Sequence, residues 1–381
     1  MDVIFVKYKI AAIGDIHWGA LDAEKQWSEL SFLFDYLQSA KINLLVICGD
    51  YFDHKLLLNS QASVMSIDFM HKLIKIAKKK KFIIRVIVGT RSHDYDQLEV
   101  FAPMEDDTFK IFRTTTMEET LPQLQCLYAP DETMSNEKYF NTYPEVLTNT
   151  YDIMFFHGNF DVVAGNLIMD SNQLDNVVYE YEVFSQLANI MIGGHWHDAD
   201  QYGRLYYTRS MNRWKFGEDN TKGFIECIYD TDADTYTVSR ISNNDTDAYR
   251  TFLVDTSLFS SVDEYSNLIT NIDDAMSKDS SMHVRIKVEV TNDSPCNDTF
   301  LDNLRIKYQN NRLVRIVIEN KFVKQQKKKK REAINDAKDA YSFLFNGNLS
   351  IIDKIKEYVK VTKDIELSDE ELKEILSKYL H

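Results

Sequence analysis

The chain has 381 residues, 44% of them hydrophobic, and a formal net charge of −15. This length allows two or three domains, and the apolar content is ample for buried cores, which excludes a largely disordered protein. No apolar run of about 18 residues occurs, and the N-terminus lacks the basic start, apolar block and cleavage site of a signal peptide. We therefore expect a cytoplasmic protein with no membrane partner.

The four cysteines lie far apart and form no C-x-x-C pair, so neither a disulfide framework nor a cysteine zinc site is predicted. The acidic net charge argues at first against nucleic acid as a partner. The charge is segregated, however: from Arg305 to Arg331 there are eleven Lys and Arg against the single acid Glu319, a local charge of +10. The basic run 327–331 is either a solvated linker or a DNA contact.

Up to about residue 230, predicted strands alternate with predicted helices, which is typical of an α/β fold. The strands cover 9–13, 44–48, 82–88, 151–156 and 190–192, and the helices lie near 23–40, 59–80 and 136–147. Three further short strands, at 203–208, 223–229 and 236–241, are expected to form a second sheet packed on the first.

The composition changes near residue 243, where we place a domain boundary. Residues 243–324 are predicted to form a small α+β domain, with strands at 251–254, 283–290 and 313–323 and helices at 263–276 and 299–310. A basic linker at 325–334 would lead to a helical segment at 335–381, with one helix near 350–361 and another from Ser368, where Glu371 completes a capping-box pattern. These amphipathic helices either pack back on the chain or bind a partner helix, and we expect the partner.

Five short segments rich in Asp and His each follow a predicted strand. They are G-D-I-H (14–17), G-D-Y-F-D-H (49–54), S-H-D (92–94), F-H-G-N (156–159) and G-G-H-W-H (193–197). Hydrolysis of a phosphodiester needs a nucleophile made from water at neutral pH and compensation of charge on the phosphoryl oxygens. Two divalent metals about 3.5–4 Å apart, held by carboxylates and imidazoles, supply both.

Asp15 and His17 occupy alternate positions of an extended strand end and should point to the same side, as should His195 and His197. Asp50 comes from a third strand end and is well placed to bridge two metals. A lone D-x-H pair is weak evidence, and His157 alone would more often be a structural histidine. The order and context of all five segments favour a metal-dependent phosphoesterase.

In this order the motifs resemble those of the calcineurin-like metallophosphoesterases, over about residues 8–230. Within that superfamily the chain is similar to the SbcD-type nuclease subunits of DNA double-strand-break repair complexes. A phage-encoded version is one form that this resemblance allows, and it would act in the host cytoplasm. The specific cues are the D-I-H-W-G start, Phe216-Gly217-Glu218 and Lys222-Gly223-Phe224. The resemblance implies an α/β fold: a calcineurin-like four-layer β-sandwich flanked by helices at 1–242, then a small α+β capping domain and a C-terminal helical segment.

The resemblance also implies roles for the Asp and His residues. Asp15, His17 and His197 would hold one metal, and Asp50, His157 and His195 the other, with Asp50 shared and Mn²⁺ the preferred ion. His93 would act as an acid toward the leaving oxygen. Asp53 would orient His93, although a turn or capping role is the alternative.

One departure from the family pattern concerns the second metal. Where the family has G-N-H-D, the chain reads Gly89-Thr90-Arg91-Ser92-His93-Asp94, so Ser92 would replace the asparagine ligand. A hydroxyl is a poorer donor than an amide, so this metal is expected to be weaker, or completed by water or Asp94. Arg91 either contacts a substrate phosphate or balances charge. His54 either contacts substrate or is merely exposed.

The sequence therefore predicts a manganese-dependent DNA exo/endonuclease that hydrolyses phosphodiesters at DNA ends. An SbcC-like ATPase would bind the C-terminal helices, and a homodimer is compatible with this assembly. The chain has no G-x-x-x-x-G-K-[ST] loop, so the ATPase must be another chain. Two alternatives stay open: a stand-alone phosphatase or phosphodiesterase, and a non-catalytic scaffold with a degenerate second metal site.

Overall fold

The computed structural model describes residues 6–94, 96–132, 134–163, 178–198, 201–218, 220–255, 262–290, 298–320 and 351–363, with Ser368 and Leu372. The chain divides into two compact units. The first comprises Met1–Thr251 with Ala275–Val284, and the second Phe252–Asp274 with Arg285–His381. The predicted basic linker at 325–334 lies outside the described residues, as does most of the helix expected from Ser368, and the predicted domain boundaries stay predictions.

The first unit contains two six-stranded sheets. The first sheet has the strand order β14-β13-β1-β2-β3-β4. Its strands β1 to β4 run parallel, whereas β13 pairs antiparallel with β1 and β14 antiparallel with β13. The bounds are β1 Lys7–Ile13, β2 Leu44–Cys48, β3 Ile83–Ile87, β4 Phe109–Phe112, β13 Gly223–Asp230 and β14 Thr235–Ser242.

The second sheet has the order β11-β12-β10-β7-β6-β5. Strands β12, β10, β7 and β6 run parallel, so their carboxyl ends lie at the same edge of the sheet. In both sheets, several of these carboxyl ends lead into polar segments. The bounds are β5 Thr116–Leu121, β6 Leu124–Ala129, β7 Tyr151–His157, β10 Ala188–Gly194, β11 Gln201–Tyr202 and β12 Leu205–Tyr207. A small parallel pair joins β8 (Asn159–Phe160) to β9 (Val178–Tyr179).

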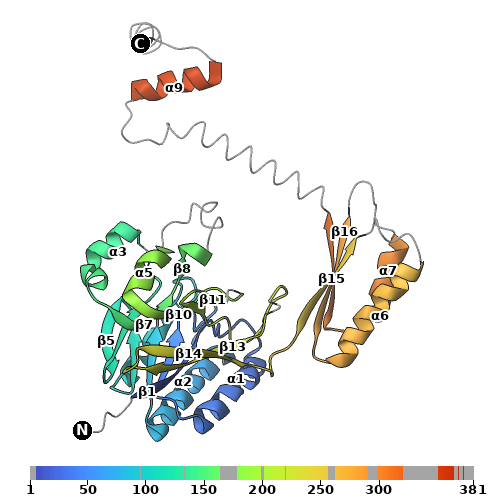
Figure 1. Ribbon diagram of the computed structural model, residues 1–381. Coiled ribbons are helices and arrows are strands. Elements are labelled where there is room, and N and C mark those ends of the chain that lie inside the picture. The colour runs from blue at the N-terminus through green and yellow to red at the C-terminus, as the bar shows by residue number, and fades with distance from the viewer. Residues whose placement is uncertain are drawn as a thin grey trace. The chain divides into compact units, whose positions relative to one another are not determined.

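The two sheets pack face to face, with helices on both outer faces (Figure 1). Alternate residues such as Val46 and Ile192 fill the core between the sheets. Helices α1 (Ala23–Ser39) and α2 (Gln61–Lys80) bury their apolar faces against the first sheet. Helices α3 (Asn136–Thr142) and α5 (Tyr181–Leu187) cover the second. This helix–sheet–sheet–helix arrangement confirms the expected four-layer α/β fold.

Helix α2 shows how local sequence fixes an element. The Ser60 hydroxyl accepts a hydrogen bond from the backbone of Ser63 at its start, and Lys81 ends it in the left-handed conformation (φ 65°) with a backbone bond to Ala77. Lys78, Lys79 and Lys80 occupy the last turn, where positive charge suits the helix dipole. The predicted helix is confirmed to within two residues at its start.

Two expectations need correction, and some elements were not predicted. Strands β13 and β14 were expected in the second sheet but extend the first, because β13 pairs with β1 over Lys7–Ala12. The helix expected at 136–147 is interrupted because Pro144 lacks a backbone N–H and begins a separate 3-10 turn, Pro144–Leu147. The sequence pattern also missed β4, β5 and β6 and the 3-10 helix η1 (Gln97–Met104).

The second unit is built on a three-stranded sheet with the order β15-β16-β17, where β15 begins in the first unit. The bounds are β15 Tyr249–Asp255, β16 His283–Val290, β17 Val314–Asn320, α6 Val262–Lys278 and α7 Asp298–Tyr308. Val288, Ile272 and Leu304 are buried, which places a core between the sheet and these helices. Farther along, α9 (Ile351–Lys363) forms as predicted. None of the helices that the structure describes has the length and apolar composition needed to cross a membrane.

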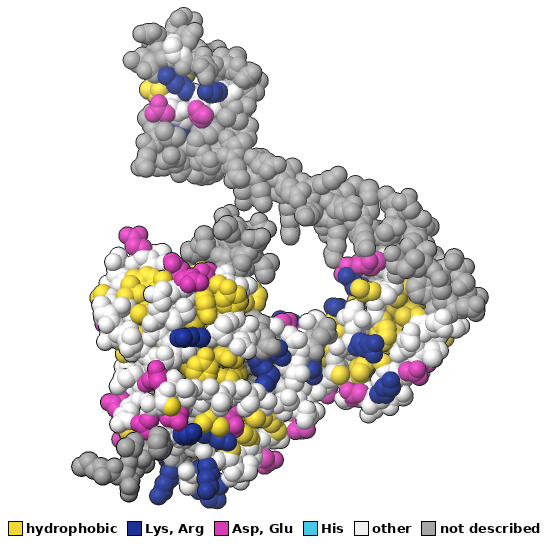
Figure 2. Space-filling model, viewed as in Figure 1, with side chains coloured by type: hydrophobic (Ala, Val, Ile, Leu, Met, Phe, Trp, Pro, Cys, Tyr) yellow, Lys and Arg dark blue, Asp and Glu magenta, His cyan; other side chains and the backbone are white. Residues whose placement is uncertain are grey.

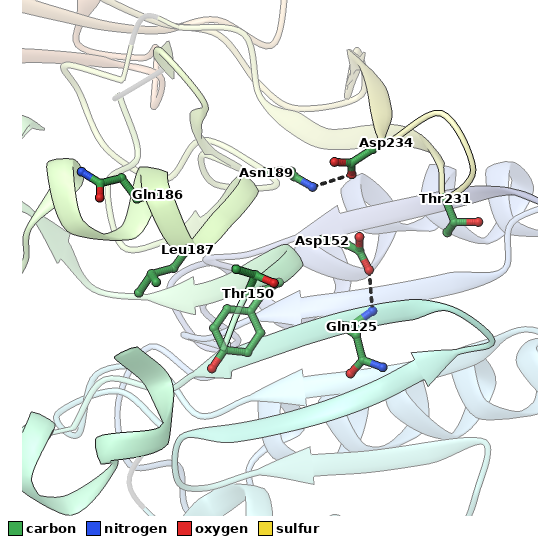
Figure 3. A pocket seen from close by; sticks show the side chains of 9 residues that line it. Gln125, Thr150, Asp152, Gln186, Leu187, Asn189, Thr231 and Asp234 are labelled. Atoms are coloured by element: carbon green, nitrogen blue, oxygen red, sulfur yellow. Dashed lines mark hydrogen bonds between the residues drawn. The ribbon is translucent and has the colours of Figure 1, made fainter. Parts of the chain in front are cut away.

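A polar hollow of about 400 Å³ lies at the amino ends of β7 and β10, the ends opposite their histidines (Figure 3). Its carboxylates are satisfied within the protein: Asp152 accepts from the backbone of Gln125 at 2.6 Å, and Asp234 accepts from the side chain of Asn189 at 2.5 Å. It is lined by Gln125, Thr150, Tyr151, Asp152, Gln186, Leu187, Asn189, Thr231 and Asp234.

The packing between the sheets yields a test centred on Tyr128, which is fully buried and stacks on Phe112 of the first sheet at 4.2 Å between ring centroids. Its hydroxyl bonds to Thr120 at 2.8 Å. We expect Tyr128→Ala to lower the free energy of unfolding by about 3–5 kcal/mol through the cavity it leaves. Tyr128→Phe, which removes only the hydrogen bond, should cost about 1 kcal/mol. Urea denaturation followed by circular dichroism measures both, and equal losses would contradict a packing role.

Candidate metal centre

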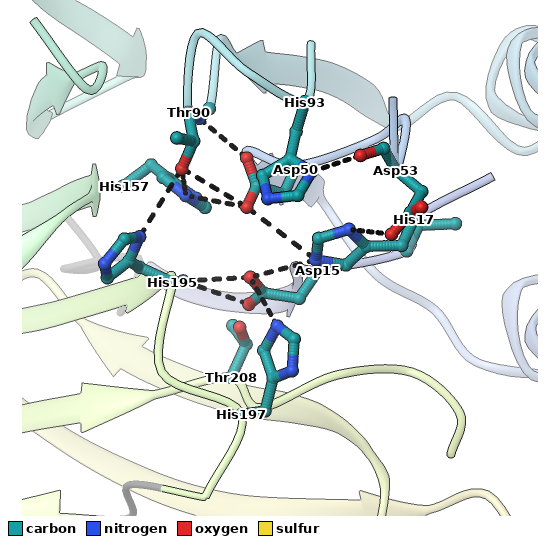
Figure 4. Close-up of polar contacts among 12 residues, drawn as sticks. Asp15, His17, Asp50, Asp53, Thr90, His93, His157, His195, His197 and Thr208 are labelled. Atoms are coloured by element: carbon teal, nitrogen blue, oxygen red, sulfur yellow. Dashed lines mark hydrogen bonds and ion pairs between the residues drawn. The ribbon is translucent and has the colours of Figure 1, made fainter. Parts of the chain in front are cut away.

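The Asp and His segments converge where strands of the two sheets end (Figure 4). Asp15 and His17 follow β1, Asp50 follows β2, and Thr90 and His93 follow β3. His157 is the last residue of β7, and His195 and His197 follow β10. The strand-end positions predicted from sequence are thus confirmed, and the sandwich brings these ends together from both sheets.

The backbone at these ends is not extended, contrary to the sequence expectation. Asp15, His17, Asp50 and His195 have φ values of 50°, 52°, 48° and 100°, and they make up half of the eight non-glycine residues with positive φ in the described chain. L-residues rarely adopt this conformation, and strained residues tend to cluster at functional sites. The turns, rather than strand alternation, aim these side chains inward.

Six of these residues form two groups with ligand spacing. In the first group, Asp15, His17 and His197, the atoms that could bind a metal lie within 4.8 Å of one another. The same holds for Asp50, His157 and His195. Asp50 Oδ2 lies 3.3 Å from His157 Nε2 and 3.7 Å from His17 Nε2, so this carboxylate faces both groups. That position suits a shared ligand.

Three histidines have an oxygen neighbour at Nδ1, through a hydrogen bond for His157 and His197 and through a close contact without hydrogen-bond geometry for His17. His157 Nδ1 donates to the carbonyl of Cys48 at 2.7 Å. His197 Nδ1 lies 3.1 Å from the Glu218 carboxylate, and His17 Nδ1 lies 3.3 Å from Asp53 Oδ1. In each case Nε2 is left to face the carboxylates of the cluster (Figure 4). Such outer contacts fix the ring and its tautomer at metal sites.

The donor set fits a divalent cation. His17 is 2% exposed, and its Nε2 has no hydrogen-bond partner among the described residues although Asp15 Oδ1 lies 3.9 Å away. A buried imidazole nitrogen without a partner is costly unless something else binds it. Asp15 and Asp50 are equally buried, at 0% and 2% exposure. Carboxylates and imidazoles with these spacings are a ligand set for borderline or hard divalent metals.

The electrostatics show how strongly the site attracts positive charge. Burial opposes ionisation of Asp50, but the charges of His157 and His17 outweigh it and hold its pKa below the usual range. Burial likewise opposes protonation of His157, but the Asp50 carboxylate outweighs it and raises the pKa of His157 to about 10. The pKa of His197 is raised to about 9, where Asp15 and Glu218 outweigh its burial. A bound cation would take over the charge that these protons supply.

His93 lies beside the cluster, with its ring centroid 4.7 Å from that of His17. Its Nδ1 hydrogen-bonds to the backbone carbonyl of Asp53, so its Nε2 is free to carry a proton toward a ligand. His93 also has ligand spacing to His17 and Asp50, so geometry alone permits it to bind a metal. The Asp53 carboxylate was expected to orient His93 but instead contacts His17 and His54. The contact of Asp53 with the His93 ring is made by its backbone carbonyl.

Other predicted site residues make contacts that differ from the roles expected for them. Ser92 and Arg91 are exposed, and no hydrogen bond or ion pair joins either of them to another described residue. His54 is exposed and contacts Asp53 at 3.0 Å. Asp94 is fully buried and accepts from the backbones of Phe52 at 3.0 Å and Gly89 at 2.7 Å, so its carboxylate ties two loops together and does not face a metal.

The hydroxyl in the second group belongs to Thr90 rather than Ser92. Thr90 Oγ1 lies 3.4 Å from Asp50 Oδ2 and 3.2 Å from His157 Nε2, and the Thr90 backbone donates to Asp50 Oδ1 at 2.6 Å. Thr90 directly follows Gly89, the residue that leads out of the β3 end. A side chain at Gly89 would collide with the Asp50 backbone, since an added Cβ would lie 2.1 Å from its nitrogen.

Sequence reasoning also missed three supporting residues. Gln26 on α1 is fully buried and holds the loop that carries His17, donating to the carbonyls of Ile16 at 2.8 Å and His17 at 3.0 Å. Trp214 packs against His17 and His197 with ring centroids at 4.7 and 4.8 Å. Glu218 was noted only as part of the F-G-E motif, which was the available signal for it.

The comparison with protein families agrees with this geometry. The model of the calcineurin-like phosphoesterases matches residues 8–234, more than half of the chain. The chain belongs to the calcineurin-like phosphoesterases. No curated protein matches its sequence.

Membership in this family makes the convergent Asp and His cluster the centre of a metal-dependent phosphoester hydrolase. The matched region contains all the strand ends that carry the cluster, and it ends between β13 and β14, whose antiparallel pairing extends the first sheet. Family membership therefore explains both the two-sheet sandwich and the convergence of the candidate metal ligands.

The contact between Glu218 and His197 can be tested by metal binding. We expect Glu218→Ala to weaken binding of one Mn²⁺ by about 10–100-fold, because His197 loses the partner that orients it. Glu218→Gln keeps an acceptor oxygen and should lose less Mn²⁺ affinity than Glu218→Ala. Calorimetric titration of the full-length chain measures the affinity, with Glu137→Ala, an exposed position on α3, as the control. Unchanged affinity in Glu218→Ala would contradict this role.

Proposed function

We propose that the chain is a manganese-dependent DNA nuclease that hydrolyses phosphodiesters at DNA ends, as the subunit of an SbcCD-like complex. The observation that carries the proposal is the pair of three-residue groups facing one carboxylate, Asp50. Two ions on a shared ligand suit in-line displacement at a phosphodiester. When bound, they supply Lewis acidity toward the phosphoryl oxygens and activate the attacking water.

The residues of the chain have separate tasks in this reaction. Asp15, His17 and His197 would hold one ion, and Asp50, His157 and His195 the other. His93 would hold a proton at Nε2 for the leaving oxygen, with the Asp53 carbonyl fixing its ring through Nδ1. Trp214, packed against His17 and His197, limits the movement of these rings.

DNA as substrate is supported by the second unit. Arg312 and Arg315 are exposed, and neither has an ion pair with another residue that the structure describes. Arg305 and Lys307 are already paired, with Asp302 at 3.3 Å and Asp273 at 2.8 Å. On the face of this unit seen in Figure 2, basic side chains are interspersed with hydrophobic ones. Exposed arginines of this kind contact phosphates without reading sequence.

An ATPase partner is proposed for the C-terminal segment. On α9, Ile352 and Tyr358 are 38% and 48% exposed, which leaves apolar area for a partner helix. Ser368 and Leu372 are joined by a backbone bond of 3.1 Å with helical spacing, which agrees with a helix start at the predicted capping box. A second copy of the chain in the assembly stays a prediction.

One argument for the alternative of a non-catalytic scaffold is weakened. It rested on the loss of a metal ligand at position 92, whereas the hydroxyl of Thr90 lies within 3.5 Å of three atoms of the second group. The stand-alone phosphatase alternative predicts hydrolysis of phosphomonoesters without residues 332–381.

Nuclease activity should depend on His93. We expect the wild type to degrade linear duplex DNA in Mn²⁺, and His93→Ala to lose about 10²–10⁴-fold in rate, because the leaving oxygen lacks its acid. Asp50→Asn should abolish activity while leaving the fold intact. Gel assays with and without the partner ATPase measure cleavage, and calorimetry measures bound Mn²⁺.

The outcomes separate the readings. No cleavage by the wild type, even with the ATPase, would sink the nuclease proposal. Loss of one bound Mn²⁺ in His93→Ala would make His93 a metal ligand rather than an acid. Full activity in Asp50→Asn would refute its shared position.

The arginines of the second unit should contribute to DNA affinity. We expect the double change Arg312→Ala and Arg315→Ala to weaken duplex binding for any sequence and to reduce the slope of log affinity against log salt by about 1 per lost phosphate contact. Arg305→Ala, at an arginine already paired with Asp302, is the matched control. Fluorescence anisotropy at several salt concentrations gives both values, and an unchanged slope would place the DNA elsewhere.

A further inference from the structure

The Thr90 hydroxyl lies among three atoms that can each donate a lone pair. Its Oγ1 is 3.2 Å from His157 Nε2, 3.4 Å from Asp50 Oδ2 and 3.5 Å from His195 Nδ1 (Figure 4). Asp50 Oδ2 and His157 Nε2 are themselves 3.3 Å apart. The four atoms come from the ends of four different strands.

The four atoms are of the kinds that bind divalent cations. His157 donates through Nδ1 to the Cys48 carbonyl, so Nε2 is the ring nitrogen that faces Thr90. A carboxylate oxygen, two ring nitrogens and one hydroxyl oxygen therefore face one another, and a cation between them would bind all four.

The separations also match a coordination shell. Neighbouring ligand atoms held at about 2.1 Å by one octahedral cation lie about 3 Å apart. The distances from Thr90 Oγ1 to the other three atoms, 3.2 to 3.5 Å, are close to that value and similar to one another.

A fifth residue lies close to the loop that carries Thr90. Asp131 follows β6, and its backbone nitrogen bonds to the carbonyl of Val88 at 3.3 Å, which holds the β6 and β3 ends together. Its carboxyl is coupled electrostatically to His157 and Asp50 of the same group. In the proposal the Thr90 hydroxyl turns its proton toward Asp131, which leaves its oxygen lone pairs for the cation.

The geometry points to Thr90 as the fourth protein ligand of the metal held by Asp50, His157 and His195, with Asp131 positioning its hydroxyl. The inference rests on the proposed metal centre and names the ion class: a divalent cation such as Mn²⁺ that accepts oxygen and imidazole ligands. Because a neutral hydroxyl is a weak donor, this ion should be bound less tightly than the one at Asp15, His17 and His197.

The test is Mn²⁺ binding by the chelator-stripped full-length chain, measured by calorimetry and by electron paramagnetic resonance without DNA. We expect two ions per wild-type chain. Thr90→Val keeps the shape of the side chain but lacks the hydroxyl. It should weaken the binding of one Mn²⁺ ion by 10-fold or more and leave the affinity for the other ion unchanged. Thr90→Ser should bind both ions almost as tightly as the wild type does. Asp131→Asn should lose less Mn²⁺ affinity than Thr90→Val.

The matched control is Ser92→Ala, which removes an exposed hydroxyl two residues away and should change nothing. Melting curves in chelator check that each variant is folded to the same extent. Two wild-type affinities in Thr90→Val would overturn the inference, as would a loss in Ser92→Ala of the size expected for Thr90. A wild type that binds two ions but never cleaves DNA would sink the proposed nuclease function and leave this ligand assignment standing.

Discussion

The structure depends on one electrostatic constraint: two carboxylates, Asp15 and Asp50, are buried where the carboxyl ends of strands from both sheets meet. Buried charge is costly unless positive groups compensate it. The histidines provide that compensation, as the raised pKa of His157 shows, and a divalent cation would provide it better. The two-sheet sandwich is what brings these groups close enough to interact.

Holding such groups together requires support that is itself buried. The left-handed backbone at Asp15, His17 and Asp50 stores strain, and neighbouring contacts over-determine it. Gln26 holds the loop of His17, and Asp94 joins the loops that follow β2 and β3. These buried contacts hold the lining of the centre in place, and electrostatic catalysis requires groups that are positioned in this way.

The centre combines what the family match covers with an arrangement that the structure adds. The match to the calcineurin-like phosphoesterases includes every Asp and His segment of the centre. The Thr90 hydroxyl lies within 3.5 Å of three atoms of the group at Asp50, and in our proposal it sets the donor strength there. In the proposed function, DNA and a protein partner would be bound by residues outside the centre, the exposed arginines of the second unit and the exposed apolar side chains of α9.

Much of the fold and most of the site were accessible from sequence, for local reasons. Apolar runs at 44–48 and 151–156 end on Asp or His, and the cap at Ser60 and the periodicity of α2 fix that helix. What sequence could not decide were matters of pairing and direction. β13 joins β1 rather than the second sheet, Asp53 faces His17 rather than His93, and Thr90 takes the place expected for Ser92. Residue type and order determine which chemistry the chain carries, because ligand preference is a property of each side chain. Which atoms meet is decided only in the tertiary structure, because positive φ values and contacts across strands set the direction of each group.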